Sequence, residues 1–116
     1  MPSAPFIKRT GAVEAVAAVS EGEMRFTDIN EAVTVSSATL SNRLKEGKVE
    51  DLWEERLVPD PESDGRSRRE YVMKRRGREL AEAIEDTDVL ELIERRAELK
   101  AEIERTLDEI GGVEEI

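Results

Sequence analysis

The N-terminal third of the chain carries apolar side chains every three or four positions, a spacing that predicts two short helices. The first covers residues 10–19 and takes Thr10 as its N-cap. The second is capped by Thr27, because a threonine hydroxyl can accept from the free N–H groups of a first turn. Its Ile29 and Val33 lie four residues apart, so they share one face. Both helices therefore have one side to bury.

A third helix is predicted to start at Ser36 or Ser37 and to run at least to Glu46, with Gly47 interrupting or loosening it. One face holds two leucines four residues apart. The opposite face carries small, polar and basic side chains. Such a face suits the floor of a DNA major groove, although any solvated helix face looks similar.

The hydrophobic period then changes to two, which is typical of strands. Residues 52–58 and 69–74 are predicted to form a hairpin, and the segment between them is rich in Pro, Asp and Gly. We interpret Trp53, at the base of this hairpin, as a core anchor. Stacking on a ligand or a base is the alternative interpretation.

The last third of the chain predicts a long helix. A first helical piece over residues 79–84 is followed by an interruption at 86–88, where Asp86 or Thr87 caps the next segment. Residues 89–110 then give about six turns, roughly 33 Å, and a Gly-Gly pair ends the helix. Its apolar stripe needs a partner, and we expect a second copy of the chain, with folding back on its own domain as the alternative. The expected dimerisation residues are Val89, Leu92, Ile93, Leu99, Ile103, Leu107 and Ile110.

Charge is distributed unevenly along the chain. The net charge is −10, yet residues 66–78 hold seven bases and a single acid, Glu70. Residues 79–116 hold fourteen acids against four bases. A basic island in an acidic chain indicates a local demand for positive charge, which a nucleic-acid phosphate backbone most commonly creates.

Composition excludes several functions. The 116 residues suffice for one domain with an appended long helix, and they include neither cysteine nor histidine. Disulfides, thiolate zinc sites, thiol redox sensing and the usual nucleophile–base pairs are therefore excluded. We expect no enzyme activity, no metal site and no cofactor; a carboxylate-metal enzyme is the weakest alternative. No apolar run reaches the roughly 20 residues of a membrane span, and no signal peptide is evident, so we expect a cytoplasmic protein without a membrane partner.

Three segments resemble winged helix-turn-helix transcription regulators of the PadR, HxlR and MarR-like families. Residues 24–33 resemble their second helix, residues 35–44 their recognition helix, and residues 71–80 the segment that closes the wing and opens the next helix. The resemblance implies an α+β, mostly α fold with a two-stranded wing and a long C-terminal dimerisation helix. It divides the chain into a DNA-binding domain, 1–85, and a dimerisation helix, 86–116. The cysteine common in HxlR-type regulators is missing, so their thiol sensing does not transfer.

The same resemblance implies a sequence-specific regulator that binds double-stranded DNA as a homodimer. Its recognition helix would enter the major groove, with the basic wing at the minor groove or backbone. Asn42 is the best candidate for a base contact, because an amide can donate and accept at adenine. The expected DNA-binding residues are Ser36, Ser37, Thr39, Ser41, Asn42, Arg43, Lys45, Arg66, Arg68, Arg69, Lys74, Arg75 and Arg76. The alternative is a protein-interaction module whose acidic C-terminal helix binds a basic partner, which would not need so many bases around the wing.

The acidic composition, with only five lysines, resembles the proteins of extreme halophiles. Small haloarchaeal stress regulators have this character, and the resemblance implies a role in a stress response. An acidic protein on DNA also predicts an unusual dependence on salt, with cations taken up between carboxylates and phosphates.

Overall fold

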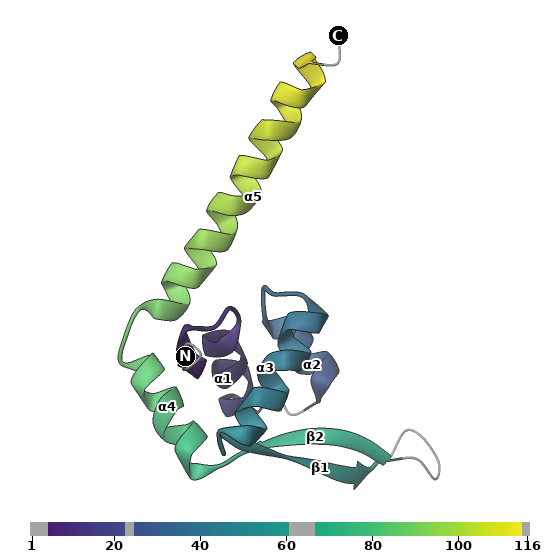
Figure 1. The fold of residues 1–116 in the computed structure, drawn as a ribbon, viewed down its shortest axis with the longest axis vertical. Helices are drawn as coiled ribbons and strands as arrows, with labels where there is room; N and C mark the ends of the chain where they lie inside the picture. The colour runs from purple at the N-terminus through teal and green to yellow at the C-terminus, as the bar shows by residue number, and fades with distance from the viewer. Residues whose placement is uncertain (1–4, 23–24, 61–66, 115–116) are drawn as a thin grey trace.

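The computed structural model describes residues 5–22, 25–60 and 67–114. A short 3-10 helix, η1 (Phe6–Lys8), precedes α1 (Ala12–Ser20), α2 (Phe26–Ala32) and α3 (Ser37–Val49). The hairpin β1 (Trp53–Pro59) and β2 (Ser67–Met73) follows, and then α4 (Arg75–Glu85) and α5 (Val89–Glu114) (Figure 1). The described chain is thus mostly helical with one two-stranded antiparallel sheet. This confirms the predicted fold class and the order of its elements.

The first two helices begin differently from the prediction. Gly11, not Thr10, is the N-cap of α1, and its φ of 83° is a left-handed conformation that favours glycine. A Cβ atom there would also lie 2.9 Å from a methyl group of Val35. The N-cap of α2 is Arg25, which lacks a side-chain capping bond, so Thr27 lies inside the first turn. Contact with Val35 therefore constrains the start of α1, and the backbone of Arg25, at the start of α2, pairs with that of Glu70 on the hairpin.

Helix α3 starts as predicted and ends later. The Ser36 hydroxyl accepts from the N–H of Thr39 at 3.2 Å, which confirms the serine cap. The prediction that Gly47 interrupts the helix is wrong, because α3 continues to Val49. It ends in a Schellman motif. Asp51 adopts a left-handed φ of 64°, and the N–H groups of Asp51 and Leu52 donate to carbonyls of the last turn.

The core lies where α1, α3, α4 and the base of the hairpin meet. Trp53 is fully buried, and its indole N–H donates to the carbonyl of Leu44 at 2.9 Å. Its ring also meets Phe6 edge to face, with centroids 6.1 Å apart. Ile29, Leu40 and Leu44 are buried beside it. Trp53 is therefore a core anchor, as the sequence indicated.

The hairpin is in register from Trp53 opposite Met73 to Pro59 opposite Ser67. Lys74, predicted to end the second strand, is instead the N-cap of α4. This helix begins at Arg75, earlier than predicted, and includes Gly77. A Cβ atom at Gly77 would lie 2.1 Å from the Met73 sulfur and 2.2 Å from the Leu52 carbonyl oxygen. The absent side chain thus lets α4 pack directly on the base of the hairpin.

Helix α5 leaves the rest of the molecule and extends away from it (Figure 1). Its 26 residues span about 39 Å, and none of them is buried. The radius of gyration is accordingly 17.5 Å, against about 13 Å for a compact domain of this length. The N–H of Val89 donates to the hydroxyl of Thr87 at 3.3 Å, but Asp88, and not the predicted Asp86 or Thr87, directly precedes the helix. The Gly111-Gly112 pair does not end the helix, because a glycine only weakens a helix, by about 1 kcal/mol.

Candidate nucleic-acid interface

The outer face of α3 is polar and open. Ser37, Asn42 and Lys45 are exposed and Thr39 and Ser41 half-buried, while the two leucines on the opposite face are buried. Because the helix passes through Gly47, it adds two residues to this face that the sequence reasoning missed. These are Lys48 and Val49, and Val49 is 86% exposed. Their three- and four-residue spacing from Lys45 was the signal that could have found them.

Hydrogen bonds hold the turn that joins α2 to α3. The Ser37 hydroxyl donates to Oδ1 of Asn30 at 3.2 Å, and the Ser36 hydroxyl donates to that of Thr39 at 3.0 Å. Glu14 is a buried carboxylate on α1. It accepts from the Thr34 N–H at 2.6 Å and from the Thr34 hydroxyl at 2.8 Å. Such charge-assisted bonds are stronger than neutral ones, so α1 fixes the angle at which α3 leaves the turn.

Arg43 faces the protein rather than the outer face of α3. Its Nε donates to the carbonyl of Thr10 at 2.8 Å, and its Nη1 meets Glu46 at 2.8 Å. Arg9 reaches the same carboxylate at 2.9 Å. Burial raises the pKa of Glu46, but the hydrogen bonds from Arg9 and Arg43 outweigh it and leave the pKa below its ordinary value. This cluster fastens α3 to the start of α1.

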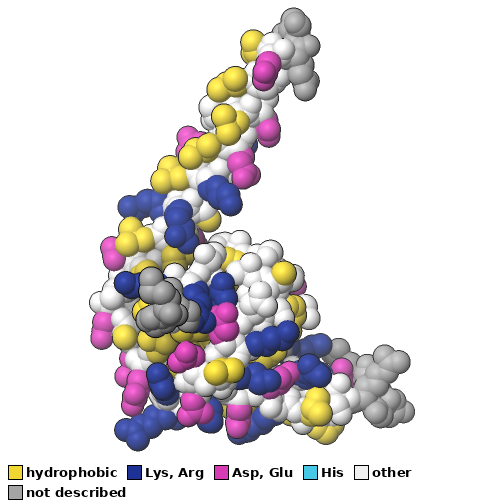
Figure 2. Space-filling view, viewed as in Figure 1, with side chains coloured by type: hydrophobic (Ala, Val, Ile, Leu, Met, Phe, Trp, Pro, Cys, Tyr) yellow, Lys and Arg dark blue, Asp and Glu magenta, His cyan; other side chains and the backbone are white. Residues whose placement is uncertain are grey.

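The basic island lies around the hairpin and the start of α4, and its positive charges alternate with acidic ones (Figure 2). Arg66 is outside the described residues. The described ion pairs of the predicted DNA-binding bases are Arg68–Glu70 at 3.0 Å, Arg69–Glu55 at 3.4 Å, Lys74–Asp51, Arg75–Glu79 at 3.2 Å and Arg76–Glu50 at 3.8 Å. Arg68–Glu70 is half-buried, whereas pairs exposed on both sides, such as Arg75–Glu79, contribute about 0–1 kcal/mol each. A phosphate can therefore replace such a carboxylate at little cost.

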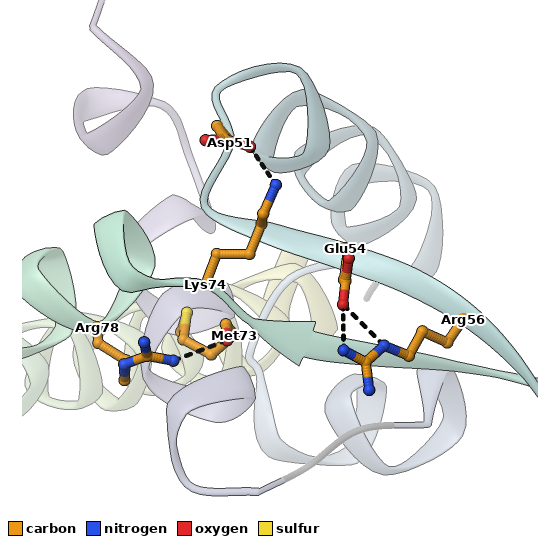
Figure 3. A network of polar contacts seen from close by, with 6 residues as sticks. All are labelled: Asp51, Glu54, Arg56, Met73, Lys74 and Arg78. Carbon is orange, nitrogen blue, oxygen red and sulfur yellow. Dashed lines mark hydrogen bonds and ion pairs between the residues drawn. The ribbon is translucent and has the colours of Figure 1, made fainter.

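Lys74 shows how these pairs join separate elements. It lies between β2 and α4, and its ammonium points to Asp51 in the turn after α3 (Figure 3). The hydrogen bond and charge of Lys74 lower the pKa of Asp51, and the same contact raises the pKa of Lys74. Nearby, Arg78 donates to the carbonyl of Met73 at 3.0 Å. The start of α4 is thereby held against the hairpin despite its clustered positive charge.

One edge of α5 is a row of uncovered apolar side chains (Figure 2). Those of Leu92, Leu99, Ile103, Leu107 and Ile110 are 48–59% exposed. Two predicted members of the stripe behave differently. Val89 packs against the core, and Ile93 is half-buried beside α1. Val113, 70% exposed, continues the row and was missed because the helix was expected to end before it.

Two kinds of feature are missing from the part of the chain that the structure describes. No group of three or more acidic side chains is arranged to hold a metal ion. Each helix in that part is too short or too polar to cross a membrane.

The packing of α2 and α3 against α1, beside a hairpin that leads into α4, defines a winged helix-turn-helix protein. The chain belongs to the HxlR-like helix-turn-helix family, which matches residues 12–107. Proteins of this family are DNA-binding transcription regulators and not enzymes. No curated protein matches this chain.

Solved structures show the same fold at low sequence identity. The reduced form of the transcriptional regulator YodB from B. subtilis is 19% identical, with a TM-score of 0.59 over 70% of this chain and 76% of that one. BpsR from Bordetella bronchiseptica is 18% identical, with a TM-score of 0.56 over 93% and 79%. The DNA complex of MepR from S. aureus is 18% identical, with a TM-score of 0.51 over 90% and 82%. These likenesses concern the fold.

Proposed function

We propose that this chain is a transcription regulator that binds double-stranded DNA sequence-specifically as a homodimer. The observation that carries the proposal is the open polar face of α3 beside Arg68 and Arg69 of β2 and the basic start of α4. An α-helix fits the major groove, where base edges differ in their donors and acceptors. A basic wing fits the minor groove or the phosphate rims next to it.

The residues divide by the contact that each can make. Asn42 is the proposed base reader, and Lys45 and the hydroxyl side chains around it supply further polar contacts. The wing arginines, Arg66, Arg68 and Arg69, are proposed for the minor groove or its rims. Lys74, Arg75 and Arg76 are proposed to position phosphates, which fix orientation without reading sequence. Arg43 is better explained as a structural residue, because reaching phosphate would cost it both of its partners.

The dimer is proposed to form through the uncovered edge of α5. Residues 1–85 then form the DNA-binding domain, and residues 86–116 form the dimerisation helix. Five large apolar side chains in a row would otherwise stay in water, and burying such side chains is favourable by about 25 cal/mol per Å². Pairing two copies would place two α3 helices in successive major grooves, on the order of 34 Å apart.

The acidic surface suggests the conditions in which the protein works. We propose a haloarchaeal type of regulator that acts in the cytoplasm in a stress response. Cations would bind between its carboxylates and the DNA phosphates. Support comes from the net charge of −10 and from the carboxylates that pair with five described bases of the island, Arg68, Arg69, Lys74, Arg75 and Arg76.

Genome-wide crosslinking followed by sequencing of bound DNA tests the proposal. We expect a short two-fold symmetric motif with half-sites about one helical turn apart. Purified protein should then bind a duplex with this motif more tightly than a shuffled duplex of equal length. If neither experiment finds sequence-dependent binding, the proposed function is wrong. Capture of a basic protein partner through α5 would then favour an interaction module.

A further inference from the structure

Glu55 joins the recognition helix to the wing. Its Oε2 lies 2.6 Å from Nζ of Lys48, near the end of α3, and its Oε1 lies 3.4 Å from Nη1 of Arg69 on β2. The Glu55 side chain is only 18% exposed, whereas those of Lys48 and Arg69 are 41% and 73% exposed. One sheltered carboxylate thus holds two cations that face solvent.

The backbone fixes this arrangement. Glu55 lies opposite Tyr71 in the hairpin, and Arg69 is two residues before Tyr71, so both charges lie on the same face of the sheet. The Schellman motif after Val49 sets the end of α3 and so the place of Lys48. The backbone therefore brings two cations to one carboxylate, and the same two cations could bind another anion.

We propose that Lys48 and Arg69 form a binding site for a DNA phosphate, and that Glu55 occupies this site until DNA displaces it. The proposal rests on the proposed function, because it concerns how the same surface binds DNA. A phosphate oxygen and a carboxylate oxygen accept the same charge-assisted hydrogen bonds from lysine and arginine. The protein's own carboxylate therefore competes with the DNA backbone.

Comparison with Glu46 distinguishes this cluster from a structural one. Glu46 also binds two cations, Arg9 and Arg43, but their side chains are only 22% and 17% exposed. A polymer phosphate would have little access to them. The cations of Glu55 come from two elements of the proposed DNA interface and stay accessible. Displacement by DNA is thus sterically open at Glu55 and hindered at Glu46.

The chain's single tyrosine reports on the cluster. Burial raises the pKa of Tyr71, and the charge of Glu55 raises it further, while Lys48 and Arg69 act in the opposite direction. Neutralising Glu55 should therefore lower the pKa of Tyr71. Ultraviolet absorbance can follow this titration without DNA, so it tests the contact separately from binding.

The experiment compares Glu55→Gln with Glu54→Gln. Both remove one negative charge from β1, but Glu54 pairs with Arg56 on its own strand, so it is a matched control. Binding isotherms on one motif duplex and one shuffled duplex are measured at several salt concentrations. We expect Glu55→Gln to bind both duplexes roughly three- to thirtyfold more tightly at low salt, because two ion pairs whose cations face solvent no longer have to be broken. The slope of log K against log salt should become more negative by up to about 0.9, the value for one phosphate.

The gain should require both cations. In a protein that also carries Lys48→Ala and Arg69→Ala, Glu55→Gln should no longer increase affinity. If the wild-type protein binds DNA and Glu55→Gln matches Glu54→Gln in affinity and slope, the inference is wrong and the proposed function stands. If wild type and variant both fail to bind any duplex, the proposed function fails and the inference fails with it. An unchanged Tyr71 pKa in Glu55→Gln would also contradict the proposed contact.

Discussion

Gly47 and Trp53 are in direct contact between α3 and β1. A Cβ atom placed on Gly47 would lie 2.0 Å from Cζ2 of the indole and 2.3 Å from Cε2. The missing side chain lets the ring approach the backbone of the helix closely while its N–H reaches the carbonyl of Leu44. The recognition helix and the wing are therefore joined through a glycine that the helix, taken alone, would not prefer.

This contact predicts the effect of a single methyl group. Gly47→Ala should lower the free energy of unfolding by about 1–3 kcal/mol, because overpacking a filled core forces side chains or backbone to move. Gly111→Ala is the control, since nothing lies within 4 Å of a Cβ atom at that position. It should gain up to about 1 kcal/mol from helix propensity. Urea unfolding measures both changes, and a neutral Gly47→Ala would contradict the packing described here.

The Glu46 cluster predicts a dependence of stability on pH. The folded state lowers the pKa of Glu46 below its ordinary 4.5, so its stabilising contribution is present above that value and is lost as pH falls through the folded pKa. Glu46→Gln should therefore destabilise the protein near pH 7, and its difference from wild type should shrink towards about pH 3. Glu82→Gln, which removes an exposed carboxylate on α4, is the control. A difference that stays constant with pH would argue against the cluster.

The proposed dimer predicts the result of charging the apolar edge of α5. Leu99→Glu combined with Ile103→Glu should give monomers in light scattering and weaken operator binding, because two carboxylates cannot be buried there without partners. Ala101→Glu combined with Arg105→Gln changes the net charge equally on the opposite side of the helix. That control should remain dimeric. A dimeric Leu99→Glu, Ile103→Glu protein would show that α5 is not the interface.

Substitutions in α3 and in the hairpin should change DNA binding in different ways. Asn42→Ala should cost about 1–3 kcal/mol on the specific site and relax the preference at one base position. Arg68→Ala should weaken binding to many sequences by a similar factor if Arg68 contacts phosphate. Competition with a set of single-base variants of the operator separates the two patterns. Equal losses on specific and random duplexes for Asn42→Ala would remove it from direct readout.

Salt should affect this protein unusually. DNA binding ordinarily weakens with salt, because each neutralised phosphate releases counterions. Here cations also screen the acidic α5 helices and can bind the carboxylates that DNA displaces. We expect a shallow slope, or a positive one at low salt, in isotherms from about 0.1 to 2 M KCl. Folding and dimerisation should improve at molar salt. A steep loss of affinity, with complete folding in dilute buffer, would contradict both the halophilic interpretation and this role of α5.

Local sequence patterns determined much of the fold. The helical spacing of Leu40 and Leu44 predicts which face of α3 is buried, because a helix must turn its apolar stripe inward. The change to a period of two predicts the hairpin, and Trp53 is identified as its anchor. The apolar row on α5 is visible in the sequence for the same reason. Each of these features depends only on the order of side chains along one element.

Tertiary structure decided where the elements end and which charges meet. Gly47 and Gly77 read as helix breakers, yet both lie inside helices, because the space that a side chain would fill is occupied by Trp53 and by Met73 with Leu52. A glycine weakens its own helix, whereas the close packing that it permits involves a different element of the fold. The sequence also shows the basic island, but it does not show which acidic residue each of these bases pairs with. Glu55 meets Lys48 and Arg69 only because the hairpin register and the end of α3 bring three separate segments together.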